Sequence, residues 1–323
     1  MAQAEGSRAY IGIQEETTYG SDPGAPDITL IPYSSEDIRA SQNLIRADLI
    51  RRTRNASRPG PGNISVDGSI TTKLFAEMGL LFKGALGSVS TAGADPYTHT
   101  FVPANSLPSF VIEKGFEDIA QYLKCNGCKI GGFSGDINQE GFFTLSFPIM
   151  GQKETPSGSP FDATPTEIAP TVFNNFDIST IEEGGASIAI VTAISGLTYD
   201  NTLNGNNFVI NPSAPGIRTG VAAGLPYVSG TLEASFENLT LLNKAINSTE
   251  SSLKIIWSLG DGLGSAGNES LEIYIPELIY ARNSPVVESA QGITISLAFE
   301  GYYQDHADAA SLKVVLKNST ATY

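Results

Sequence analysis

The most reactive side chains in this 323-residue sequence are two cysteines, Cys125 and Cys128, and two histidines, His99 and His306. The cysteines form a C-x-x-C motif, which occurs in zinc sites and in dithiol redox centres. A closed zinc site needs four ligands, and a redox pair needs a thioredoxin-like βαβ setting that the sequence does not show. We therefore expect both thiols to be reduced and to lie in a turn that leads into a strand.

The sequence shows no pattern typical of a catalytic centre. Two histidines are too few for most acid–base or triad schemes, and Gly132–Gly135 does not form a nucleophile elbow. Acidic pairs such as Glu15-Glu16 and Glu182-Glu183 are common on surfaces, although carboxylates alone can hydrolyse glycosides. We expect a chain that is not an enzyme and that uses no cofactor and no metal.

One glycine-rich segment, Gly262–Gly267, fits the dinucleotide-binding pattern G-x-G-x-x-G. That chemistry requires a helix directly after the glycines, because the helix N-terminus binds the pyrophosphate. Here the segment is followed by Leu271–Pro276, which alternates between apolar and polar residues like a strand. A flexible hairpin loop is the better interpretation.

Arginines are concentrated in one stretch of a chain that is otherwise acidic. Asp and Glu number 34 against 19 Lys and Arg, for a net charge of −15. Six arginines lie close together in the sequence: Arg39, Arg46, Arg51, Arg52, Arg54 and Arg58. Guanidinium groups bind carboxylates in a bidentate fashion, so the cluster is a candidate inter-subunit contact. A solvated loop and a DNA-binding site are the alternatives, and the acidic balance disfavours the second.

The elements that would position these residues are mostly short strands. Alternating or apolar stretches separated by Gly, Pro and Asn predict strands near 9–14, 64–70, 98–102, 108–114, 128–137 and 141–150. Apolar residues at three- and four-residue steps predict an amphipathic helix from Leu74 to Ala85. Residues 38–54 are compatible with strand or helix, and Arg58–Gly62 predicts a break.

The second half of the chain repeats the order of the first. Val228–Ala234 matches Val66–Thr72, Leu241–Ala245 matches Leu80–Gly84, and Ala290–Ala298 matches Gln139–Phe147. Recurrence of three blocks in one order favours an internal duplication. We expect residues 1–155 to form one copy with an N-terminal arm, and residues 156–323 to hold a linker and a second copy. The two copies differ, since the counterpart of the arginine cluster, around Leu197–Arg218, is rich in Asn and Gly.

Compartment signals are weak in this sequence. No apolar run approaches the roughly 18 residues that a membrane helix needs, and the N-terminal segment lacks the apolar region of a secretory signal. We expect synthesis in a cytoplasm, without a membrane anchor.

The order of features resembles that of the tail tube proteins of siphophages, the long flexible-tailed bacteriophages. The motifs that carry this resemblance are Glu15–Gly20 (EETTYG), Gly68, the Leu-rich helix, Pro108-Ser109, Gly127-Cys128, Gly141, the Gly230 helix block and Ile275-Pro276-Glu277. Each motif is short, so the resemblance lies in their order along most of the chain.

The resemblance implies a mostly β protein with two tandem β-sandwich or barrel-like tube folds, each with a flanking α-helix. It implies a structural subunit of the virion tail, assembled in the host cytoplasm into stacked rings that form a channel for DNA ejection. Two folds per chain would make each ring a trimer with pseudo-sixfold symmetry. The resemblance also implies a tape measure protein and a tail terminator as partners, and DNA that passes through the lumen without specific binding.

Other functions fit a β-rich acidic chain as well. The main alternative is a β-sandwich binding module, such as a carbohydrate-binding or adhesive tail protein, and a capsid decoration protein is a third. The single tryptophan, Trp257, lies in an apolar strand-like run and so offers little support for a ligand platform. For a tube, we expect a channel wall with net negative potential, because Lys and Arg contacts with phosphate would slow DNA.

Overall fold

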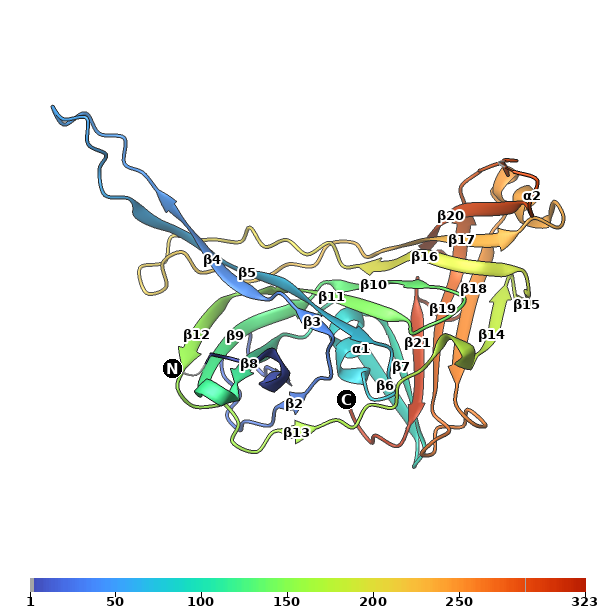
Figure 1. The fold of residues 1–323 in the computed structure, drawn as a ribbon, viewed down its shortest axis with the longest axis horizontal. Coiled ribbons are helices and arrows are strands. Elements are labelled where there is room, and N and C mark those ends of the chain that lie inside the picture. The colour runs from blue at the N-terminus through green and yellow to red at the C-terminus, as the bar shows by residue number, and fades with distance from the viewer. Residues whose placement is uncertain (1–2, 288) are drawn as a thin grey trace.

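The computed structural model describes residues 3–287 and 289–323. In this part of the chain, twenty-one strands accompany two short α-helices, so the protein is mostly β as predicted (Figure 1). The elements up to the middle of the chain are β1 (Ala9–Glu15), β2 (Thr29–Leu30), β3 (Ser35–Glu36), β4 (Arg39–Ile45), β5 (Gly60–Lys73), α1 (Gly79–Leu86), β6 (Gly87–Gly93), β7 (Tyr97–Pro103), β8 (Phe110–Phe116), β9 (Gln121–Ile130), β10 (Gly132–Ile137), β11 (Thr144–Gly151) and β12 (Lys153–Ser157).

The rest of the chain contributes fewer elements. These are β13 (Thr166–Glu167), β14 (Ile178–Glu183), β15 (Ala186–Ser187), β16 (Val191–Asp200), β17 (Tyr227–Ser235), α2 (Thr240–Ile246), β18 (Ser251–Ser258), β19 (Ser270–Tyr280), β20 (Thr294–Tyr302) and β21 (Lys313–Asn318). Short 3-10 turns occur at Gly6–Arg8, Glu117–Ile119 and Asn175–Asp177.

One sheet runs through the whole molecule. Its strands pair in the order β4, β5, β11, β10, β16, β17, β20, and every neighbouring pair is antiparallel. The sheet crosses the upper side of Figure 1, with α1 packed beneath it. Two antiparallel ladders join the halves, β10–β16 in this sheet and β7–β21 elsewhere, so the halves are united by backbone hydrogen bonds as well as by side-chain packing.

A second layer closes each half into a sandwich. In the first half, β9 pairs with β12 at one end and with β11 at the other, so this strand turns from one sheet into the other. In the second half, β19 changes partner in the same way, from β21 to β20. Apolar side chains of both layers, including Phe147 and Trp257, are buried together with Phe82 of α1.

The same set of pairings occurs in both halves. The pairs β5–β11, β8–β9 and β9–β11 of the first half have as counterparts β17–β20, β18–β19 and β19–β20 of the second. A register shift interrupts β8–β9 between Phe110 and Ile112, and another interrupts β18–β19 between Ser251 and Leu253. A shared bulge is a specific feature, since a bulge inserts one residue at a defined place in a ladder.

In the structure, the last of the three sequence matches, Gln139–Phe147 with Ala290–Ala298, is shifted by one residue. Phe147 lies opposite Ile70, and Leu297 lies opposite Leu232, so Phe147 corresponds to Leu297 and not to Ala298. Phe147 and Leu297 are both buried, whereas Ala298 is exposed. A slip of one residue exchanges the two faces of a strand, which is why burial fixes the register.

Three local predictions were wrong. The helix begins at Gly79 and not at Leu74, because the backbone of Leu74 and Ala76 bonds to Phe143 and Thr171. The predicted break at 58–62 is the start of β5, where Pro61 is tolerated because this end pairs with β4 alone. The C-x-x-C motif lies within β9 and not in a turn before it.

Candidate functional site

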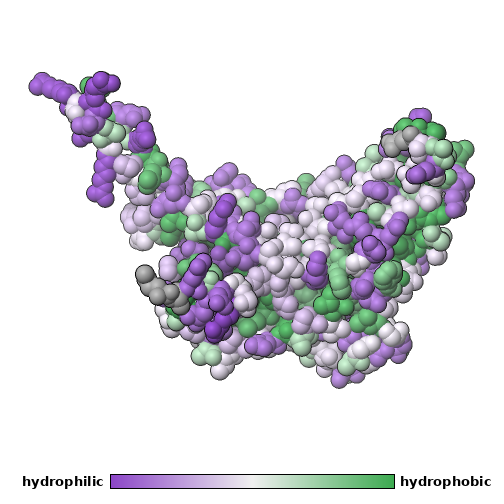
Figure 2. Space-filling model, viewed as in Figure 1, coloured by the Kyte–Doolittle hydropathy of each residue, from purple (hydrophilic) through white to green (hydrophobic). Residues whose placement is uncertain are grey.

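The outer face of the long sheet is polar and continuous. Along β5, β11, β17 and β20, buried residues alternate with solvent-facing ones. The solvent-facing positions hold mostly small polar side chains, among them Ser69, Thr71, Ser146, Thr231 and Ser296. We call this surface the polar face. It lies on the upper side of the molecule, where Figure 2 shows an outline hollowed between the extended hairpin and the end that contains α2.

Acidic residues outnumber basic ones on the polar face. Each of five strands contributes one acid: Asp67, Asp136, Asp200, Glu233 and Glu300. The bases at this face are Arg39, which lies opposite Asp67, Lys73, which donates a hydrogen bond to Thr144, and Arg218, which forms an ion pair with Asp67. The face therefore has a net negative charge, and anions that pass over it are repelled.

The predicted arginine cluster divides between two places. Arg39 lies on β4, within the sheet. The other five, Arg46, Arg51, Arg52, Arg54 and Arg58, lie on residues 46–59, which we call arm 1. Arm 1 is the tip of the β4–β5 hairpin and extends away from the body in Figure 1. Within the described chain, none of the six arginines forms an ion pair, so their charge is available to other molecules.

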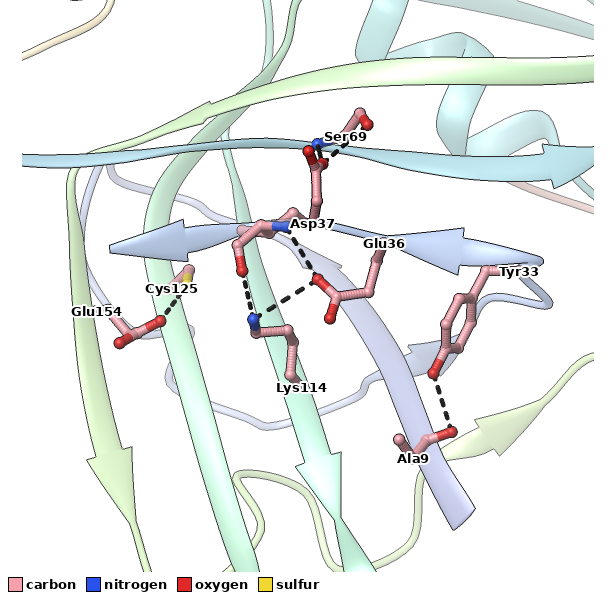
Figure 3. A network of polar contacts seen from close by, with 9 residues as sticks. Ala9, Tyr33, Glu36, Asp37, Ser69, Lys114, Cys125 and Glu154 are labelled. Carbon is pink, nitrogen blue, oxygen red and sulfur yellow. Dashed lines mark hydrogen bonds and ion pairs between the residues drawn. The ribbon is translucent and has the colours of Figure 1, made fainter. Parts of the chain in front are cut away.

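Below arm 1, the segment Ser35–Ser41 forms the free edge of the long sheet. Its inner side pairs with β5, and no other described strand pairs with its outer side. Lys114 of β8 holds the segment by binding Glu36 and the carbonyl oxygen of Ile38, and Asp37 accepts two hydrogen bonds from Ser69 (Figure 3). The edge is thus fixed in place before any partner arrives.

A close backbone approach shapes this edge. A Cβ at Gly68 would lie 2.4 Å from the Cα of Ile38, so only glycine allows the edge segment to cross β5 there.

A second long hairpin tip, residues 201–226, which we call arm 2, joins β16 to β17. Arm 2 lies along the first half of the chain and extends in the same direction as arm 1 (Figure 1). Its Arg218 is 5% exposed and binds both carboxylate oxygens of Asp67 at 2.9 and 3.1 Å. The same guanidinium donates to the carbonyl oxygen of Gly151 at 2.9 Å. This role has no sequence signature, because Arg218 stands alone in an Asn- and Gly-rich stretch.

Two further residues anchor the start of arm 2. The side chain of Asn201 donates to the carbonyl oxygen of Ala85 at 2.6 Å, and its backbone N–H donates to that of Gly131 at 2.7 Å. The side chain of Leu203 lies close to Gly131. Arm 2 therefore shows which contacts an arm of this kind makes with the half that it crosses.

The other motifs singled out in the sequence contribute to the core and the loops. Cys125 and Cys128 are buried free thiols, and they occupy the positions that Ile275 and Leu278 take in the second half. Burial raises the pKa of Cys125 to about 12, and the pKa of Cys128 is raised as well. Trp257 is fully buried and stacks on Phe143 at 5.4 Å, so it is no surface platform.

The glycine-rich segment at 262–267 lies in the loop between β18 and β19, as predicted. Among the residues that the structure describes, no three His, Cys, Asp or Glu side chains form a group that could hold a metal ion. Neither of the two helices in the described chain is long and apolar enough to cross a membrane.

Comparison with known proteins gives one informative match. A family model described as phage tail tube protein matches residues 6–301, which is nearly the whole chain. No curated protein matches the sequence.

Proposed function

This chain belongs to the phage tail tube protein family, and from that membership we propose that three copies close each ring of a tail tube. The protein is a structural subunit of the virion tail, and members of this family are structural proteins. In the proposed ring, residues 1–155 and 156–323 hold two copies of one fold, and three chains supply six similar positions.

The repeated strand pairings support two copies per chain. The β5–β11 and β17–β20 ladders agree in register, and the bulges in β8–β9 and β18–β19 occupy matching places. Within one chain the two halves meet through unlike surfaces, β10 of one and β16 of the other. Repetition of such a head-to-tail contact closes into a ring when the rotation between the halves divides a full turn.

The observation that carries the proposal is the continuous sheet with its hollowed polar face. We assign this face to the channel wall. The acids Asp136, Asp200, Glu233 and Glu300 would repel phosphates, and the small Ser and Thr side chains would make few contacts with a passing DNA strand. DNA then slides through without specific binding.

Arm 1 is the proposed bridge to other subunits. Its five arginines extend from an acidic protein, so they fit carboxylates on an adjacent chain or ring. The ends of a tube need different partners, and the tape measure protein and the tail terminator are the partners that the family resemblance implies.

Electron cryomicroscopy of tubes assembled from purified protein tests this function. The expected map shows three chains per ring, the polar face toward the lumen and no added metal or cofactor. Six chains per ring would overturn the tandem arrangement, and a polar face on the outside would overturn the assignment of the channel wall.

A further inference from the structure

The β10–β16 joint between the two halves is a template for a strand pairing between neighbouring chains. In that joint, β10 follows β9 and lies between β11 and β16. Its register with β16 sets Gly132 opposite Asp200, Phe133 opposite Tyr199 and Ser134 opposite Thr198.

The second half contains a counterpart of β10 that lies near β20 but pairs with no strand in the part of the chain that the structure describes. The N–H of Gly131 donates to the carbonyl oxygen of Pro148, and the N–H of Ala281 donates to that of Ala298, both at 2.7 Å. Residues 282–287 therefore follow β19 in the same position as β10 follows β9. They belong to no strand and are mostly exposed, with Val286 67% and Val287 71% exposed.

The first half contains a counterpart of β16 that pairs with β5 on one side, and no described strand pairs with its outer edge. Ala40 pairs with Val66 as Tyr199 pairs with Val228, and Arg39 pairs with Asp67 as Thr198 pairs with Ser229. The free edge at Ser35–Ser41 is thus the surface that β16 presents to β10. An unpaired edge of this kind is a template for a strand from another chain.

We propose that residues 282–287 of one chain become a strand on the Ser35–Ser41 edge of the next chain. The proposal rests on the ring described above and specifies its contact. The register follows from the β10–β16 joint: Arg282 lies opposite Ser41, Asn283 opposite Ala40 and Ser284 opposite Arg39. The added strand makes the sheet of one chain continuous with that of the next.

The base of arm 1 enters a groove beside this new strand. The groove has a volume of about 590 Å³, and Ala281, Ala298 and Phe299 line it. The corresponding place in the first half, beside Gly131 and Pro148, measures about 390 Å³ and is lined by Leu203 of arm 2.

Leu44, which lies on β4 at the base of arm 1, is the residue that matches Leu203. Leu44 lies opposite Pro61, one residue before the Ile45–Gly60 pair, and Leu203 directly precedes the bridge between Asn204 and Ala222. Leu44 is 70% exposed in the single chain. In the ring its side chain covers Ala281 and Ala298 of the adjacent chain, where it loses contact with water.

Cysteine cross-linking within assembled tubes tests the register. Arg39→Cys and Ser284→Cys, combined in one chain, place two thiols directly opposite each other on the polar face of neighbouring chains. Mild oxidation with copper phenanthroline is expected to give covalent dimers and trimers on a non-reducing gel, with few larger species. The buried Cys125 and Cys128 leave the wild-type protein uncross-linked under the same treatment.

The matched control displaces one thiol by two residues. Arg39→Cys with Val286→Cys keeps both side chains on one face but separates them beyond the reach of a disulfide, so this pair is expected to cross-link several-fold less. The inference is overturned if the first pair forms normal tubes but yields only monomers on the gel, or if both pairs yield equal amounts of cross-linked product. Either result leaves the tube function intact. Wild-type protein that forms no tubes would instead refute the function.

A second experiment compares the two leucines. Leu44→Ser is expected to raise the protein concentration needed for tube formation at least about tenfold, with no change in the unfolding midpoint of the free chain. Leu203→Ser is expected to lower that midpoint, because its contact lies within the chain. Leu44→Met should restore assembly. Unchanged assembly of Leu44→Ser tubes contradicts the proposed groove.

Discussion

Arm 1 and arm 2 begin from matching strand pairs, yet one is free and the other is packed. Arm 2 crosses the first half of its own chain and buries Arg218 against Asp67. Arm 1 holds five arginines and makes no ion pair within the described chain. Arm 2 thus serves folding, whereas we propose that arm 1 serves association with another chain.

The contrast predicts that changes in arm 1 affect assembly and that changes in arm 2 affect stability. The largest effect is expected for the triple substitution Arg51→Glu, Arg52→Glu and Arg54→Glu. Reversed charge repels the acidic surfaces of adjacent subunits, so tubes should be lost almost completely in negative-stain images. Circular dichroism should show an unchanged fold, and a normal tube yield would contradict the role of arm 1.

A single substitution in arm 2 sharpens the comparison. Arg218→Ala removes hydrogen bonds to Asp67 and to the carbonyl oxygen of Gly151, and should lower the free energy of unfolding by about 2–3 kcal/mol. Urea unfolding of the unassembled chain measures this. Arg58→Ala in arm 1 is the matched control and should change the same quantity by less than about 0.5 kcal/mol. Equal losses for both arginines would remove the distinction between the arms.

The polar face offers a test of moderate size. Glu233→Lys adds a ring of cations to the proposed channel wall, so DNA ejection from particles that carry the variant should slow several-fold. Added salt should relieve the slowing, because phosphate contacts weaken as salt rises. Glu233→Gln keeps the hydrogen bond from Ser195 and should eject DNA at close to the normal rate. An unaffected rate for the Lys variant would place Glu233 outside the channel.

The smallest effect is expected for substitutions in the core of the first half. There, Cys125 and Cys128 occupy the positions that Ile275 and Leu278 take in the second half. Burial raises the pKa of both thiols, so they should resist Ellman's reagent at pH 8 until the chain is unfolded. A thiol with a raised folded pKa stabilises the fold fully below its unfolded pKa of about 8.5, and this contribution is lost as pH rises toward 12. Rapid labelling of the folded chain would show that the thiols are accessible.

Replacing both cysteines by alanine should lower the free energy of unfolding by about 1–2 kcal/mol and leave tube yield unchanged. Loss of tubes by this variant at full monomer stability would show that the motif does more than fill the core.

The sequence predicted the mostly β fold from local alternation of apolar and polar residues, and it predicted the family from the order of short motifs. It did not predict the arms. Residues 38–54 carry both apolar and charged side chains in irregular order, and the surfaces that we propose arm 1 to contact lie outside its own chain. The position of Leu44 relative to Leu203 became visible only once the pairing registers of both hairpins were known.

The candidate site was predicted in part. The six arginines were identified by composition, but Arg39 separates from the others because β4 ends at Ile45 and carries only the first of them into the sheet. Arg218 and the free edge at Ser35–Ser41 were missed. A lone arginine and a two-residue strand have no sequence signature, and their importance comes from residues far away, such as Asp67 and Lys114.

The chain that runs from β12 to β14 has a kinetic consequence. It tethers the two halves, so every second contact around the proposed ring is made while the protein folds and not when separate molecules meet. A tether of this kind gives its two ends a high effective concentration for each other. Ring formation then depends on encounters among three bodies and not six, and nucleation should remain fast at low subunit concentration.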